Sequence, residues 1–155
     1  MQVPYSIVRI LATSLVAGGV GVVAMQVVMR LIARAEWAKG DMIVAIGSLL
    51  TRSRENAFPV GCLVHGVSAV AFAALYGLGL RQFGMMAFPS ALFVCIGFSI
   101  LHGLVVSLML VWIVAEQHPL EEFNEAGFAV GLTHFAGHVA YGAGVGLVFA
   151  VSTLL

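Results

Sequence analysis

Four long stretches without a single charged residue make up most of this 155-residue chain, and they constrain its fold more than any other feature. They cover residues 10–29, 59–80, 89–115 and 127–155. A helix of about 20 apolar residues is long enough to cross the hydrocarbon core of a bilayer. Only 9% of the chain is charged, too little to cover a soluble domain with a wetted surface. The pattern predicts an all-α, polytopic integral membrane protein built as a four-helix bundle.

We expect a single transmembrane domain over residues 1–155, because the connections between the stretches are too short to hold a second domain. The first stretch is expected to be a retained helix, since it is longer than the apolar core of a signal peptide. A shorter apolar segment, at approximately residues 41–51, predicts a short interfacial helix with Asp41 as its N-cap. Packing of this helix across the mouth of the bundle is equally compatible with the sequence. The spanning helices are expected at approximately residues 8–34, 59–80, 89–116 and 127–154.

The distribution of Lys and Arg predicts the orientation of the bundle. We define side A as the side of Met1 and side B as the opposite side, which holds the 31–58 and 116–126 loops. Five basic residues lie on side B and two, Arg9 and Arg81, on side A. The positive-inside rule therefore predicts that both side B loops are cytoplasmic and both termini periplasmic or outside. The five on side B are Arg30, Arg34, Lys39, Arg52 and Arg54.

Net charge excludes one class of partner. The chain has seven basic and seven acidic residues, so it lacks the basic stripe of a nucleic-acid-binding protein. The expected partners are the lipid bilayer and either other membrane subunits or further copies of this chain.

Four of the five histidines fall inside the uncharged stretches: His65, His102, His134 and His138. Ionisable side chains at membrane depth are costly and mark functional sites by default. His134 and His138 lie one helical turn apart on the same face. A rise of about 1.5 Å per residue places His65 and His134 at similar depth below side B. We predict that these four histidines face the bundle interior, where His65, His102, His134 and His138 are candidate cofactor ligands.

Three interpretations of this histidine cluster are compatible with the sequence. The imidazoles can serve as hydrogen-bonding groups between helices. They can instead hold a transition metal through His65, His134 and His138, or a haem b with His65 and His134 as axial ligands. Copper(I) is a variant, because Met25 and Met29 offer soft sulfur one turn apart. The third interpretation is a proton or solute path, since histidine titrates near neutral pH.

The remaining polar features give weaker indications of function. The acidic segment 116–125, with His118, is either a solvated turn or a point of cation uptake at the side B mouth. Cys62 and Cys95 form no C-x-x-C motif and are expected to be small buried hydrophobes. The chain has no nucleophile elbow, P-loop, dinucleotide-binding glycine pattern or H-E-x-x-H motif. We therefore do not expect an enzyme.

Several short motifs resemble small four-helix bacterial membrane proteins of uncharacterised families. They are Asp41-Met42 through Gly47-Ser48, His65 early in the second spanning helix, and His134-x-x-x-His138-x-x-Tyr141-Gly142. The resemblance covers approximately residues 18–146 and leaves out His102 and the acidic loop. It implies the four-helix fold and a bacterial inner membrane, but no chemistry.

Together these features predict a non-catalytic integral membrane accessory or structural subunit. It would belong to a larger membrane complex, respiratory or otherwise redox-active, and its histidine cluster would hold haem b or a transition metal. The alternative is a small membrane transporter or proton-conducting protein.

Overall fold

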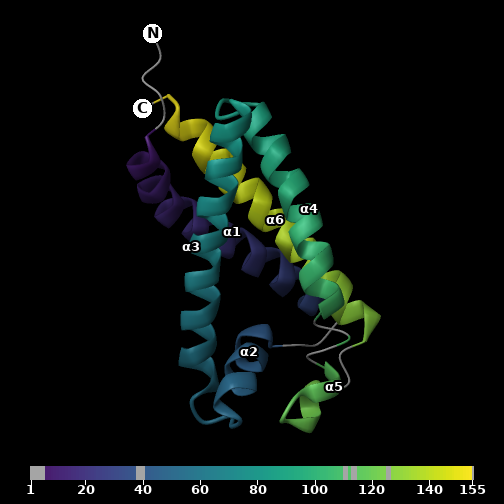
Figure 1. Cartoon of the computed structure of the whole chain (residues 1–155). Coiled ribbons are helices and arrows are strands. Elements are labelled where there is room, and N and C mark those ends of the chain that lie inside the picture. Colours follow the sequence, from purple (N-terminus) through teal and green to yellow (C-terminus); the bar gives the residue numbers. More distant parts are fainter. Residues whose placement is uncertain (1–5, 38–40, 110–111, 113–114, 125–126, 155) are drawn as a thin grey trace.

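The computed structural model describes residues 6–37, 41–109, 112, 115–124 and 127–154. This part of the chain contains helices and no strand, which confirms the all-α fold (Figure 1). Four helices, α1, α3, α4 and α6, are long and apolar enough to cross a membrane, the pattern of a multi-pass membrane protein. The elements are α1 (Ile7–Arg34), α2 (Met42–Thr51), α3 (Ala57–Phe83), α4 (Ser90–Met109), α5 (Ala115–Gln117), the 3-10 turn η2 (Glu121–Phe123) and α6 (Phe128–Ser152).

Local signals set the helix ends. The Ser6 side chain caps α1 by accepting from the Arg9 N–H at 3.1 Å, and Asp41 caps α2 by accepting from the Val44 N–H at 3.2 Å. Helix α3 ends at Phe83 and is capped by Gly84, whose φ of 67° lies in the left-handed region that favours glycine. The third spanning helix was expected to reach residue 116, whereas α4 is described to Met109. Part of the difference, residues 110–111 and 113–114, lies outside the described residues.

Helix α6 is the central element because it packs α1 on one face and α4 on the other. Small residues allow both approaches. A Cβ on Gly146 would lie 2.8 Å from the Ala91 carbonyl oxygen of α4, and a Cβ on Gly144 would lie 3.1 Å from the Gly21 Cα of α1. In a membrane, helices associate mainly through such close packing, since lipid tails are as apolar as the protein core.

The face of α4 that packs on α6 carries small side chains at every fourth residue. All five of its buried residues belong to this stripe: Ala91, Cys95, Ser99, Gly103 and Ser107. Residues four apart lie on one face of a helix, so the stripe forms a continuous flat surface against α6. At side A, the Arg9 guanidinium donates to the Ser152 carbonyl oxygen and joins the start of α1 to the end of α6.

Helices α3 and α4 touch each other little, although the short 84–89 connection joins them. They lie close at this connection and diverge toward side B (Figure 1). The short helix α2 lies across the wide end and packs closely on α3. Gly47 of α2 meets the backbone of Ala57, and Gly61 of α3 meets the backbone of Ile43. The bundle is therefore open along the α3–α4 seam and closed at its side B mouth.

Replacement of Gly146 by alanine is expected to destabilise the fold, because the new methyl group meets the α4 backbone at 2.8 Å. Overpacking of this kind costs about 1–3 kcal/mol. Thermal unfolding in detergent measures the effect as a lower midpoint temperature. Gly97→Ala is the matched control, since nothing lies within 4 Å of a Cβ at that position. Equal midpoints for the two variants would contradict the packing described for α6.

Candidate functional site

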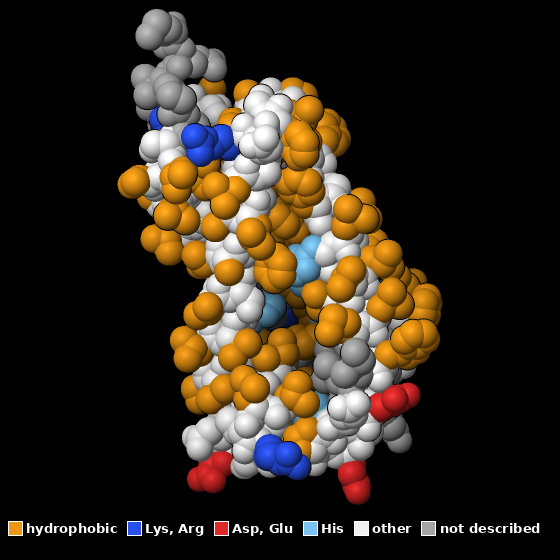
Figure 2. All heavy atoms as spheres, in the orientation of Figure 1, with side chains coloured by type: hydrophobic (Ala, Val, Ile, Leu, Met, Phe, Trp, Pro, Cys, Tyr) orange, Lys and Arg blue, Asp and Glu red, His pale blue; other side chains and the backbone are white. Residues whose placement is uncertain are grey.

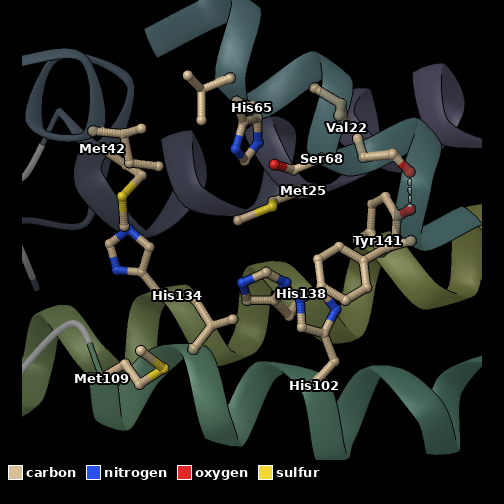
Figure 3. Close-up of a pocket in the computed structure, with 15 residues that line it drawn as sticks. Val22, Met25, Met42, His65, Ser68, His102, Met109, His134, His138 and Tyr141 are labelled. Carbon is tan, nitrogen blue, oxygen red and sulfur yellow. Dashed lines mark hydrogen bonds between the residues drawn. The ribbon is translucent and has the colours of Figure 1, made fainter. Parts of the chain in front are cut away.

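A cavity of about 300 Å³ lies between the splayed helices, and all four membrane-depth histidines line it. His65 comes from α3, His102 from α4, and His134 and His138 from α6 (Figure 3). Figure 2 shows histidine side chains within a hollow between α3 and α4. The rest of the lining is mainly apolar, including Val22 and Met25 of α1, Ile46 of α2, Val64 of α3 and Val106 of α4.

His134 has a defined tautomer. Its Nδ1 lies 2.7 Å from the Val130 carbonyl oxygen, one turn earlier in α6. A carbonyl only accepts, so Nδ1 carries the proton and donates it. In a neutral imidazole the Nε2 atom then offers a lone pair and no hydrogen. This Nε2 is buried and has no hydrogen-bond partner among the described residues.

Two more histidines leave a buried ring nitrogen without a partner. These atoms are Nε2 of His65 and Nδ1 of His138, and again no described residue bonds them. A buried polar atom without a partner costs about 1–3 kcal/mol. Three such atoms around one cavity are an unusual concentration in a native fold, where most buried polar groups are satisfied.

His102 is held more firmly than the other three. Its Nδ1 lies 3.1 Å from the Tyr76 hydroxyl, which in turn lies 3.2 Å from Oγ of Ser99. The imidazole stacks on Phe72 with ring centroids 3.7 Å apart and planes tilted by 23°. His138 approaches the same ring at 4.6 Å and 52°. Phe72, His102 and His138 thus form an aromatic wall on one side of the cavity.

The predicted metal site is not assembled in this part of the chain. Among the described residues, no group of three or more His, Cys, Asp or Glu side chains is arranged to hold a metal ion. The sulfur atoms of Met25 and Met29 give little further support for a metal site. Met25 and Met29 are buried against Gly137, where a Cβ would lie 3.0 and 3.1 Å from their Cγ atoms, so packing accounts for both.

The two cysteines differ in burial. Cys95 is buried in the α4–α6 seam, as expected, but Cys62 is exposed on α3, so the expectation of burial was wrong there.

A second cavity, of about 280 Å³, lies between α1, α2, α3 and α6. It is more polar than the first, with Gln26, Arg30, Asp41 and Thr133 in its lining. Met42 and His134 line both cavities and therefore form the wall between them. Their side chains point toward one another (Figure 3), so the Met42 thioether covers His134.

The fifth histidine has a structural role that sequence analysis missed. His118 is 5% exposed although acidic residues surround it in the sequence. Its Nε2 donates to the Ala45 carbonyl oxygen of α2 at 3.0 Å, and its Nδ1 accepts from the Leu120 N–H at 3.1 Å. An exposed ion pair between Arg54 and Glu122, at 2.7 Å, also joins the acidic loop to the segment that follows α2. The described part of the acidic loop thus holds α2 over the cavity.

The chain matches no protein-family model, no curated protein and no solved structure. The geometry of the two cavities is therefore the main indication of what the protein does.

Replacement of His118 by alanine is expected to loosen α2, because it removes the buried side chain that joins the acidic loop to Ala45. Hydrogen exchange of the α2 amides should accelerate about tenfold, the equivalent of one lost hydrogen bond of roughly 1.4 kcal/mol. Glu122→Gln is the control and should change exchange little, since exposed ion pairs contribute about 0–1 kcal/mol. If both variants exchange at the wild-type rate, His118 does not hold α2.

Proposed function

We propose that the protein is a non-catalytic integral membrane subunit that holds a membrane-soluble ligand in its histidine cavity. The observation that carries this proposal is the set of three buried ring nitrogens that have no hydrogen-bond partner among the described residues, around one mainly apolar cavity. Ligand sites combine such apolar walls with a few polar groups that fix orientation. A bound ligand with hydrogen-bonding groups would satisfy the nitrogens and recover part of their desolvation cost.

The shape of the bundle indicates where the ligand comes from. The cavity lies beside the open α3–α4 seam, and the flanking surfaces of α3 and α4 are apolar and exposed, as Leu63, Val67 and Leu101 illustrate. In a bilayer this seam faces the hydrocarbon region. The ligand would therefore diffuse within the membrane and need an apolar body.

Haem b is a second candidate, favoured by the tautomer of His134. Metal-ligating histidines usually donate their other ring N–H to a carbonyl or carboxylate, as His134 does to Val130. His134 and His65 would hold the iron through their unpartnered Nε2 atoms. Such a haem would supply one-electron transfer, consistent with membership of a respiratory or other redox complex.

The transporter or proton-conductor alternative has weaker support. The hydrogen-bonded series His102, Tyr76 and Ser99 extends from the cavity toward side A. Beyond it the described core is filled by fully buried apolar side chains, among them Leu80 and Phe149. A path that crosses the whole bundle would need these side chains to move.

We further propose a bacterial inner membrane location, with the 31–58 and 116–126 loops cytoplasmic and both termini outside. The excess of Lys and Arg on side B supports this orientation. Association with other subunits or with a second copy would involve the exposed apolar helix faces.

The ligand proposal predicts that a molecule co-purifies with the protein from native membranes in mild detergent. Val106→Phe, which fills part of the cavity, should reduce its amount at least tenfold. Val105→Phe is the matched control, because Val105 is 57% exposed and points away from the cavity. Mass spectrometry of the organic extract measures the ligand. A wild-type protein without any bound molecule, or equal loss in both variants, would contradict the proposal.

Absorption spectra and metal analysis of the same samples separate the two candidates. A Soret band that disappears in both His65→Ala and His134→Ala would establish haem. A colourless protein with an organic ligand would exclude haem and leave the first candidate in place.

The orientation predicts the result of cysteine labelling in intact cells. With Cys62 and Cys95 replaced by alanine, Ser53→Cys should resist a membrane-impermeant maleimide until the cells are permeabilised. Gln82→Cys, at the exposed end of α3, should react in intact cells. The reverse pattern would invert the proposed orientation.

A further inference from the structure

The hydrogen-bonding state of His134 restricts the chemistry of any ligand that reaches it. Its Nδ1 proton is committed to Val130, so its buried Nε2 can only accept. A charged imidazolium at this depth would lie in a low-dielectric region at high energetic cost, so we take the His134 imidazole to be neutral. The group that satisfies Nε2 must therefore bring an O–H or N–H hydrogen or a metal ion. A ligand with carbonyl or ether oxygens alone would leave this nitrogen unsatisfied.

A metal ion held by protein side chains alone has little support around this nitrogen, because the described residues form no group of three His, Cys, Asp or Glu ligands. Haem, which needs only axial side chains, stays the second candidate and is distinguished by the absorption spectrum. Among organic donors, a hydroxyl is favoured over an ammonium because the cavity lies beside an exposed apolar seam and its lining is mainly apolar. A charged head would lose its hydration there without a described carboxylate in the lining.

The wall of the cavity favours a flat head group. Phe72 and His102 stack at 3.7 Å, and His138 lies against His102 at 4.6 Å, so one side of the cavity consists of aromatic rings. Aromatic rings pair well with other rings in offset or edge-to-face arrangements, each worth about 0.5–1.5 kcal/mol. An aromatic ligand ring therefore fits this wall better than a branched aliphatic chain.

The other two unpartnered nitrogens add a second polar position. Within the part of the chain that the structure describes, no hydrogen bond fixes the tautomer of His65 or His138, so each can accept from or donate to a ligand. A ring with two hydroxyl groups can therefore donate to His134 and also bond one of these two histidines. We propose that the cavity binds a lipid-soluble hydroquinone, with one phenolic hydroxyl donating to Nε2 of His134. This inference rests on the proposed function.

Met42 would control access to this hydroxyl position. It is 6% exposed, lies over His134 and lines both cavities (Figure 3). Methionine is unbranched and has three rotatable side-chain bonds, so it can move aside without a change in the backbone. The Met42 thioether points toward the His134 ring (Figure 3), and a bound hydroxyl would take its place.

The test compares three probes that share one body: a benzohydroquinone with a decyl chain, its dimethyl ether and its quinone. Equilibrium binding to the purified full-length protein is measured without oxygen and with a reductant for the hydroquinone. We expect the hydroquinone to bind wild type at least tenfold more tightly than either the ether or the quinone, which lack a hydroxyl donor. Equal affinities for the three, or tighter binding of the quinone, would overturn the inference without any variant being needed.

Variants assign the preference to His134. In His134→Leu the hydroquinone should lose its tenfold advantage over the ether, while the ether binds as before. Thr133→Val is the matched control on α6, since the Thr133 hydroxyl is already bonded to the Ala129 carbonyl oxygen at 2.9 Å and does not line the histidine cavity. It should retain the advantage. Met42→Ala should strengthen hydroquinone binding, because the cover is removed.

The outcomes also separate this inference from the proposed function. A co-purifying lipid-soluble ligand of another class, with no binding of the hydroquinone, would overturn the inference and leave the proposed function standing. A protein that binds none of the probes and carries no native ligand would overturn both.

Discussion

The structure depends on the close approach of α6 to two neighbours at once. Glycines on opposite faces of this helix, Gly144 toward α1 and Gly146 toward α4, bring three backbones into near contact. A fourth helix cannot enter this tight group without separating it. Helix α3 therefore packs on α1 and leaves a seam with α4. The cavity is a consequence of this arrangement, because the side chains that face the seam have no helix opposite them to complete their packing.

The same constraint explains why histidines are tolerated at this depth. Where α4 meets α6, Gly103 lies so close to His138 that a Cβ would come within 2.6 Å of the His138 Cβ. The imidazole of His138 is thereby directed along the helix surface to the cavity, beside the ring of His102. A small residue between α4 and α6, Gly103, thus positions the polar side chain of His138 at the cavity beside the α3–α4 seam. The close packing of the helices and the histidine-lined cavity are therefore built from the same few sequence positions.

Sequence reasoning predicted the class of fold well and the packing of the helices poorly, for a physical reason. In water, the polar face of a helix shows which side is exposed, but the spanning helices here are apolar on every side. Cys62 and Cys95 lie in equally apolar stretches, and only Cys95 is buried. The informative signal was residue size, and the four-residue spacing from Ala91 to Ser107 could have identified the α6-facing side of α4. His118 was missed because its acidic neighbours suggested a solvated turn, whereas its partner Ala45 lies 73 positions away.

The lateral seam also determines which ligand concentration would set the occupancy of the cavity. A cavity that opens to lipid equilibrates with the two-dimensional solution of its ligand in the bilayer, so occupancy follows the mole fraction of ligand among the lipids. A lipophile that partitions strongly into the membrane reaches a high local mole fraction even when its aqueous concentration is negligible. For the proposed ligand, weak intrinsic contacts would therefore suffice to fill the cavity, and the ligand would exchange without leaving the membrane. In a cell, the composition of the surrounding bilayer would set the occupancy of the site.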